Sequence, residues 1–304
     1  MKPFVNFRNY NKNFIKTRRY FFFRLPKPLC KLCFRLFLPP ERWAEVISPK
    51  EIAATEKKNF DVHLVSFPKS GRTWLRLMIG KAIQEHFKLK CTDKEMTDLH
   101  PLAKYDKIPK IRVDHDDNPH YKSPKDVSLN KEAYCYSKVI FLSRDPRDVL
   151  VSNYFEMTKR QRLYCDDISN FLREDVGSIG ALIKYYNVWA SERNTPKDFL
   201  LVRYEDIHTN PKLELKKCLQ FVGLDIDPQA IERAVKFATF DNMHNMEREG
   251  NFDAGSLKVN DKEDQESYKT RKGVIKGFND YLSSEDIKFL DEKIESELSK
   301  YFGY

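Results

Sequence analysis

The first forty residues carry no acidic side chain, because the earliest carboxylate belongs to Glu41. Lysine or arginine interrupts every apolar run there, so none reaches the roughly 20 residues that a membrane span requires. The hydrophobic stretch of a signal peptide is also missing. We treat residues 1–45 as a basic, aromatic N-terminal extension and residues 46–304 as the domain. The extension suits peripheral contact with an anionic membrane, and the alternative is a poorly ordered tail partly packed on the domain.

The 6 cysteines lack the spacing of a disulfide framework. Cys30 and Cys33 form a lone C-x-x-C, and no second pair or histidine pair follows at zinc-finger distance. A structural metal is therefore not expected. Reduced thiols fit a cytoplasmic protein.

No repeat, low-complexity tract or glycine-rich linker divides the 304 residues, a length that suits one sizeable α/β domain. The formal net charge of +9 favours anionic partners, which include phosphorylated small molecules, nucleic acid and acidic lipid. No recognition motif for DNA or RNA accompanies the charge, so we expect no nucleic-acid partner.

Short apolar runs predict buried parallel strands at residues 63–67, 138–142 and 199–203. Helix starts are indicated where an N-cap side chain precedes a proline, or where two serines open an amphipathic pattern. These starts are Asp145-Pro146, Asn210-Pro211, Asp227-Pro228 and Ser283-Ser284. The alternation predicts an α/β fold, a single domain with a central parallel sheet flanked by helices. Ligands of such sheets bind at the carboxyl ends of the strands.

Residues 67–74, FPKSGRTW, join the first strand to a helix and form an anion cradle at the helix N-terminus. Gly71 permits close backbone approach, Lys69 adds a mobile charge, and Ser70 and Thr73 add hydroxyl donors. The G-x-x-x-x-G-K-[ST] loop is absent, because there is one glycine and the lysine precedes it. The order argues against a conventional kinase. Trp74 either offers an aromatic face to a base or anchors the helix in the core.

Two further segments carry candidate phosphate ligands. Arg144 stands just beyond the second strand and Ser152 about two turns into the next helix, where both can reach the sheet edge. The alternative is that Arg144 only pairs with Asp145 or Asp148. The run 271–273, Arg-Lys-Gly, follows a polar, turn-rich stretch from about residue 241, which suits a flap over a polyanion or, alternatively, a solvated charge pair.

Together these segments resemble the cytosolic-type sulfotransferases, whose domain is P-loop-NTPase-like. Residues 67–74 look like the 5′-phosphosulfate loop, [YF]-P-[KR]-S-G-[TN]-T-W, and Arg72 is the one departure. Arg144 and Ser152 match the 3′-phosphate motif. Residues 271–273 match the start of R-K-G-x-x-G-D-W-K, from which residues 276–279, KGFN, depart. The resemblance covers roughly residues 60 to 290.

The resemblance implies a sulfotransferase that uses 3′-phosphoadenosine-5′-phosphosulfate (PAPS) as co-substrate and needs no metal. The acceptor is a hydroxyl or amine of a small molecule, lipid or glycan, and no dimer-forming motif is recognisable. Tyr204 would bond the adenine, and Trp74 and Phe240 would sandwich it. The implied donor ligands are Lys69, Ser70, Gly71, Arg72, Thr73, Trp74, Arg144, Ser152, Tyr204, Thr239, Phe240, Arg271, Lys272 and Gly273.

A histidine at a strand end is the family's catalytic base, and His115, after the β-like run 110–113, fits that place best. His120 is the second candidate. His115 would take the acceptor's proton while Lys69 neutralises the leaving phosphate oxygen. Asp114 stands where threonine is usual, and the family's nearby lysine is missing. Residues 114–117, DHDD, could instead hold a metal or form a solvated acidic loop.

Two alternatives stay open from the sequence. A small-molecule kinase of P-loop-like type would prefer ATP·Mg²⁺ over a nucleotide with a 3′-phosphate. A non-enzymatic module would bind anionic membranes or nucleic acid through residues 1–45 and would transfer no sulfuryl group.

Overall fold

The computed structural model describes residues 59–250, 252, 257 and 261–304. The predicted N-terminal extension, the boundary at residue 46 and the Cys30–Cys33 pair lie outside the described residues. Their roles therefore stay predictions.

A parallel sheet of 4 strands forms the centre of the described chain, in the order β2-β1-β3-β4. The strands are β1 (Val62–Ser66), β2 (Ile111–Asp114), β3 (Lys138–Ser143) and β4 (Asp198–Arg203). Every neighbouring pair is parallel. The carboxyl ends of all strands consequently meet at one edge, and the predicted α/β class with a central parallel sheet is confirmed.

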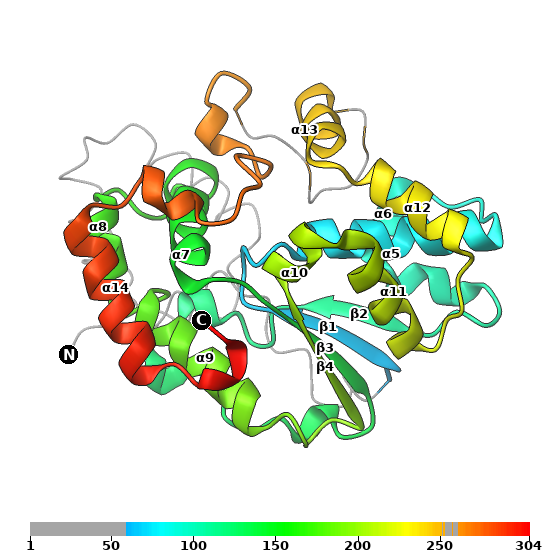
Figure 1. The fold of residues 1–304 in the computed structure, drawn as a ribbon, viewed down its shortest axis with the longest axis horizontal. Helices are drawn as coiled ribbons and strands as arrows, with labels where there is room; N and C mark the ends of the chain where they lie inside the picture. The colour runs from blue at the N-terminus through cyan, green and yellow to red at the C-terminus, as the bar shows by residue number, and fades with distance from the viewer. Residues whose placement is uncertain (1–58, 251, 253–256, 258–260) are drawn as a thin grey trace, which may run out of the picture.

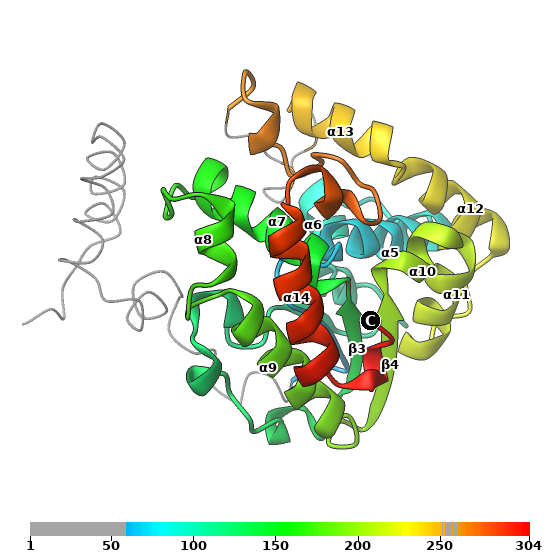
Figure 2. The ribbon, with the colours of Figure 1, turned by 60° about the vertical axis from the view of Figure 1, so that its left-hand side comes forward.

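Helices cover both faces of the sheet, because side chains alternate between the faces along each strand. Leu64 packs in the cluster shared with α5, α11 and α12, whereas its neighbour Val65 packs in the cluster shared with α7, α9 and α14. Figures 1 and 2 show these two helical layers. Their bounds are α5 (Arg72–Phe87), α7 (Pro146–Phe155), α9 (Ile179–Ser191), α11 (Pro211–Val222), α12 (Pro228–Phe237) and α14 (Ser284–Glu297).

The predicted helix starts are confirmed by their caps. The side chains of Asp145, Asn210, Asp227 and Ser283 each accept a hydrogen bond from a backbone N–H of the first turn. Gly223 ends α11 with a φ of 92°, a conformation that glycine adopts without a steric penalty. Shorter helices complete the fold: α6 (Asp93–Asp98), α8 (Ile168–Leu172) and α10 (Tyr204–Thr209).

The stretch from residue 241 to 270 is not turn-rich throughout, as the sequence had indicated, because α13 (Phe240–Glu249) occupies its beginning. Met243 and Glu247 lie one helical turn apart on α13 and are both buried. A helix with a carboxylate on its inward face escapes detection by apolar periodicity. Figures 1 and 2 show α13 beside the segment that precedes residue 273.

Candidate active site

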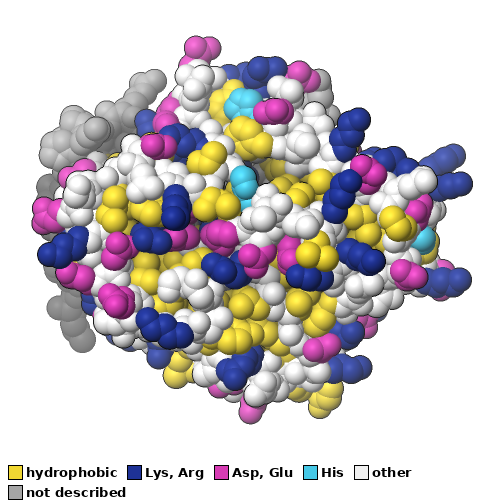
Figure 3. All heavy atoms as spheres, viewed as in Figure 1, with side chains coloured by type: hydrophobic (Ala, Val, Ile, Leu, Met, Phe, Trp, Pro, Cys, Tyr) yellow, Lys and Arg dark blue, Asp and Glu magenta, His cyan; other side chains and the backbone are white. Residues whose placement is uncertain are grey.

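A cavity of about 450 Å³ opens at the carboxyl edge of the sheet. Its walls come from the segments that follow β1, β2, β3 and β4, from α13 and from residues 269–277. Figure 3 shows basic, acidic and histidine side chains around a hollow on this face of the molecule. Of the site residues that the sequence predicts, all but Ser70 line this cavity, and Ser70 is fully buried beside it.

The loop between β1 and α5 bends sharply at two residues with positive φ, Lys69 at 73° and Gly71 at 94°. A Cβ atom at Gly71 would lie 2.5 Å from the ring of Tyr204, so the position requires glycine. The first turn of α5 contains no acidic residue. Its N-terminus and the helix dipole therefore favour an anion in the cavity.

The Lys69 ammonium donates a hydrogen bond to Glu156 Oε2 over 2.8 Å. Glu156 begins the π-helical segment η7 (Glu156–Arg160) that continues α7. Burial raises the pKa of Glu156, but Lys69 and Lys269 outweigh burial and hold the pKa at about 2. Glu156 is thus a carboxylate, and its pairing with Lys69 was not foreseen from the sequence.

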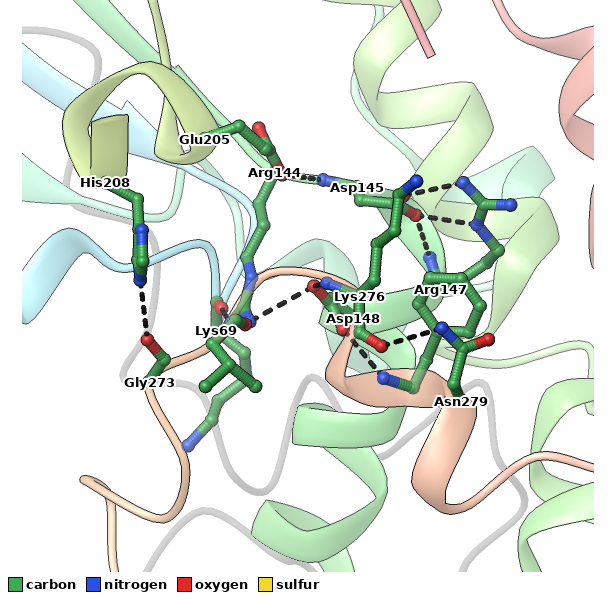
Figure 4. A network of polar contacts seen from close by, with 12 residues as sticks. Lys69, Arg144, Asp145, Arg147, Asp148, Glu205, His208, Gly273, Lys276 and Asn279 are labelled. Carbon is green, nitrogen blue, oxygen red and sulfur yellow. Dashed lines mark hydrogen bonds and ion pairs between the residues drawn. The ribbon is translucent and has the colours of Figure 1, made fainter. Parts of the chain in front are cut away.

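Arg144 reaches the cavity from the end of β3, as Figure 4 shows. Its guanidinium donates to the Val274 carbonyl over 3.0 Å and lies 3.4 Å from Asp148. It also lies over the Tyr204 ring, 4.1 Å from the centroid. Arg144 therefore lines the cavity and pairs with Asp148 as well, while Asp145 pairs with Arg147 at 2.7 Å.

The Arg-Lys-Gly run, residues 271–273, lines the cavity. The Arg271 guanidinium lies between the rings of Phe155 and Tyr281, at 4.2 and 4.5 Å from their centroids. Lys272 pairs with Asp280 at 2.6 Å.

Asp148 fixes the segment that follows, because its carboxylate accepts from the N–H groups of Lys276 and Phe278, each over 3.0 Å. Lys276 and Phe278 are positions where the chain departs from the R-K-G-x-x-G-D-W-K pattern. Because the donors are backbone N–H groups, the segment is held in place despite these departures.

The aromatic candidates lie around the same space. Trp74 packs edge-on against Tyr204 with ring centroids 5.7 Å apart, and Phe240 stacks on His244 at 6.0 Å. Thr239 is the N-cap of α13, and Ser152 belongs to α7.

His115 follows β2 directly and lies on the cavity wall. Its Nδ1 is 3.0 Å from the Ser66 carbonyl oxygen, and its Nε2 is 2.6 Å from Nη2 of Arg72. Burial, and then the charge of Arg72, hold the pKa of His115 well below its usual range. His120, the second candidate, also lines the cavity, and burial lowers its pKa to about 3.

The acidic residues beside His115 form ion pairs with basic side chains. Asp114 pairs with Arg112 at 3.2 Å, and Asp116 pairs with Lys131 at 2.8 Å. The described part of the chain contains no group of three or more histidine, cysteine or acidic side chains placed to hold a metal ion.

Lys269 is the second residue of the cavity that sequence reasoning missed. Burial, and then the charge of Lys69, lower the pKa of Lys269 to about 7. The carboxylate of Glu247, 0% exposed, accepts from the backbone N–H groups of Lys269 and Thr270 over 2.7 and 2.9 Å. The only local signal was a third basic residue close to the Arg-Lys pair.

The model of the sulfotransferase domain family matches residues 59–302, so the chain belongs to this family. Among curated relatives, the rabbit (Oryctolagus cuniculus) amine sulfotransferase is 22% identical over 260 residues, covering 81% of this chain and 83% of the relative. The guinea pig (Cavia porcellus) 3-beta-hydroxysteroid sulfotransferase is 25% identical over 258 residues, covering 80% and 85%.

Among solved structures, mouse sulfotransferase SULT7A1 complexed with PAP superposes with a TM-score of 0.56 at 18% identity, covering 82% of this chain and 89% of that chain. Together with the family match, this likeness confirms the predicted fold and the predicted enzyme class, a PAPS-dependent sulfotransferase. Within the described residues, no helix has both the length and the apolar character needed to cross a membrane.

Proposed function

We propose that the cavity binds PAPS with its 5′-phosphosulfate on the β1–α5 loop and its 3′-phosphate among Arg144, Ser152, Arg271 and Lys272. The observation that carries this proposal is the convergence of three segments, distant in sequence, on one cavity. Nη1 of Arg72 and Nε of Arg144 are buried without a hydrogen-bond partner among the described residues. Buried donors of this kind fit an anionic ligand.

The proposed chemistry assigns one task to each of two side chains. The donor supplies a sulfuryl group, whose bond to the 5′-phosphate oxygen breaks as sulfur bonds to the acceptor, and the electron pair leaves with the phosphate. His115 Nε2 takes the proton of the acceptor O–H or N–H. Lys69 stabilises the charge that develops on the phosphate oxygen.

The acceptor is proposed to be a small molecule with a hydroxyl or amine. The names of the two curated relatives, an amine and a 3-beta-hydroxysteroid sulfotransferase, support this class. His120 lies beside His115 in the cavity, with ring centroids 5.7 Å apart. A lipid or glycan acceptor, cytoplasmic location and membrane contact by residues 1–45 stay predictions.

A transfer assay with ³⁵S-labelled PAPS across phenols, amines, sterols, glycans and lipid head groups tests the function. We expect His115→Asn to lower turnover on the order of 10²–10⁴-fold, because the base is lost, while calorimetry shows that the variant still binds PAP, the desulfated donor. His100→Asn, an exposed position outside the cavity, is the matched control. Near-full turnover of His115→Asn would show that the base is another residue. Preference for ATP·Mg²⁺ over PAP in the same titration would refute the donor site.

A further inference from the structure

Arg72 is the residue at which the anion loop departs from the family pattern. It is the first residue of α5, and its side chain lines the cavity. Its Nη2 lies 2.6 Å from Nε2 of His115, while its Nη1 is buried without a hydrogen-bond partner among the described residues. Nη2 of Arg72 thus contacts the histidine, while the N–H groups of Nη1 are available to donate hydrogen bonds to a ligand.

The contact defines the proton positions on His115. A guanidinium only donates hydrogen bonds, so Nε2 must accept with its lone pair. The proton of the neutral ring then belongs to Nδ1, which donates it to the Ser66 carbonyl oxygen over 3.0 Å. The single basic nitrogen of His115 is therefore covered by Arg72.

The positive charge of Arg72 is poorly stabilised by its surroundings. Burial, and then the neighbouring Arg76, lower the pKa of Arg72 to about 9, and Asp114 offsets only part of this. By contrast, Lys69 already forms an ion pair with Glu156 at 2.8 Å. An anion that enters the β1–α5 loop therefore gains most from a cation that has no carboxylate partner among the described residues.

We infer that Arg72 is a positioning residue that couples donor binding to the availability of the base: it covers Nε2 of His115 until the 5′-phosphosulfate draws the guanidinium away. The inference rests on the proposed role of His115. Donor binding frees the lone pair at the moment when the sulfuryl group is in place. The acceptor consequently meets a competent base only in the donor complex.

The charge change at His115 has a definite sign. The groups that face it are Arg72 from α5, His120 from η4 (Pro119–Tyr121) and Lys269, and the two cations lower its pKa. Displacing Arg72 and adding an anion both favour the protonated ring, so donor binding raises the pKa of His115. Tyr185 donates to the His115 carbonyl over 3.3 Å and keeps the backbone in place meanwhile.

Imidazole ¹⁵N spectra of the full-length protein test the coupling without any turnover. The chain has 7 histidines, and His115→Asn identifies the His115 signals. We expect PAP to shift the Nε2 resonance of His115 and raise its pKa. Adenosine 3′-monophosphate, which lacks the 5′-phosphate, should leave both unchanged at saturation. An Nε2 signal that PAP leaves unmoved would overturn the inference.

Variants of Arg72 test whether the effect of PAP on His115 depends on this arginine. Arg72→Met should raise the pKa of His115 in the donor-free protein and reduce the PAP-dependent change to the part that the charge of the anion itself causes, whereas Arg72→Lys should keep more of it. Arg76→Met, one turn along α5, is the control and should preserve the response. A PAP response of wild-type size in Arg72→Met would overturn the inference, and Arg72→Lys provides the same comparison if the Met variant fails to fold. A fully active His115→Asn enzyme would refute the proposed base, whereas an unresponsive His115 signal refutes only the coupling.

Discussion

Ion pairs occupy both ends of the cavity, but their surroundings differ. At the β1–α5 loop, the side chains of Lys69 and Glu156 are 10% and 17% exposed. At the Arg-Lys-Gly segment, those of Lys272 and Asp280 are 36% and 60% exposed. Exposed pairs contribute about 0–1 kcal/mol, whereas a buried charge left without its partner costs several kcal/mol. A bound phosphate can therefore take the place of Asp280 beside Lys272 at little cost in free energy. At the loop, Lys69 can leave Glu156 only for an anion that pairs with it equally closely.

The comparison suggests a division of labour. The cation of the loop, Lys69, is largely buried beside Glu156, where electrostatic stabilisation of a changing charge is stronger than in water. At the segment, Lys272 lies partly in water, whereas Arg271 lies between the rings of Phe155 and Tyr281 with 13% of its side chain exposed. Both cations can attract and hold a phosphate. We therefore expect substitutions in the loop to affect turnover and substitutions in the segment to affect donor affinity.

Of the substitutions that compare the loop with the segment, Lys69→Met should have the largest effect on activity. Turnover should fall about 10²–10³-fold, because the charge on the leaving oxygen loses its stabilising cation, while PAP affinity changes less. Arg160 lies 3.3 Å from Glu156 and still pairs with it, so the fold should persist. Steady-state kinetics with saturating PAPS measures the effect. Lys81→Met, on α5 but outside the cavity, is the control, and equal losses in the two variants would contradict the proposed role.

A smaller effect, on binding, is expected from Arg271→Met and Lys272→Met. Each should weaken PAP binding about 10–100-fold, the range for losing a hydrogen bond to a charged group, with turnover at saturating PAPS nearly unchanged. Isothermal calorimetry and kinetics separate the two quantities. Arg233→Met, whose guanidinium pairs with Glu85 outside the cavity, provides the baseline. A loss confined to turnover would reverse the proposed division.

A third test concerns stability instead of activity and compares three glycines with positive φ. A Cβ atom at Gly71 would meet Tyr204 at 2.5 Å, one at Gly273 would meet Phe240 at 2.3 Å, and one at Gly223 would meet nothing within 4 Å. Tyr204 is 5% exposed and fixed beneath Arg144, whereas Phe240 is 39% exposed and can turn away.

Gly223→Ala should therefore lower the free energy of unfolding only by the cost of placing a residue with a Cβ atom at positive φ, roughly 1–2 kcal/mol. Gly71→Ala should cost about 1–3 kcal/mol more through overpacking, and Gly273→Ala should resemble Gly223→Ala. Urea unfolding of the three variants measures this order. Equal destabilisation at Gly71 and Gly273 would mean that the loop is no more rigid than the segment.

Local signals in the sequence predict much of this architecture. Each predicted strand appears within one residue of its expected bounds, because a short apolar run bounded by polar residues marks the extent of a buried strand. The Asp145, Asn210 and Asp227 caps act through bonds to residues two or three positions away, so the sequence contains both partners. The phosphate-loop motif is equally local.

The buried charges could not be predicted in this way. Lys69 and Glu156 are 87 positions apart, and their contact exists only because η7 continues α7 across the cavity. Lys269 reaches the same place from a segment that Glu247 anchors through backbone bonds. The contact of Arg72 with His115 likewise depends on the adjacency of β1 and β2 in the sheet. Contacts between side chains so far apart in the sequence depend on the order of the strands and helices in the fold, which a short motif does not contain.

Two carboxylates hold the backbone of the segment that contributes residues 269–277 to the cavity wall. The Glu247 carboxylate accepts hydrogen bonds from the N–H groups of Lys269 and Thr270. The Asp148 carboxylate accepts from those of Lys276 and Phe278. The residues between these two anchor points are also held from the side, because the Gly273 carbonyl contacts His208 over 3.1 Å and the Val274 carbonyl accepts from Arg144 over 3.0 Å. Release of a nucleotide from the proposed site should therefore depend on breaking a few side-chain contacts to this segment instead of on the unfolding of a domain.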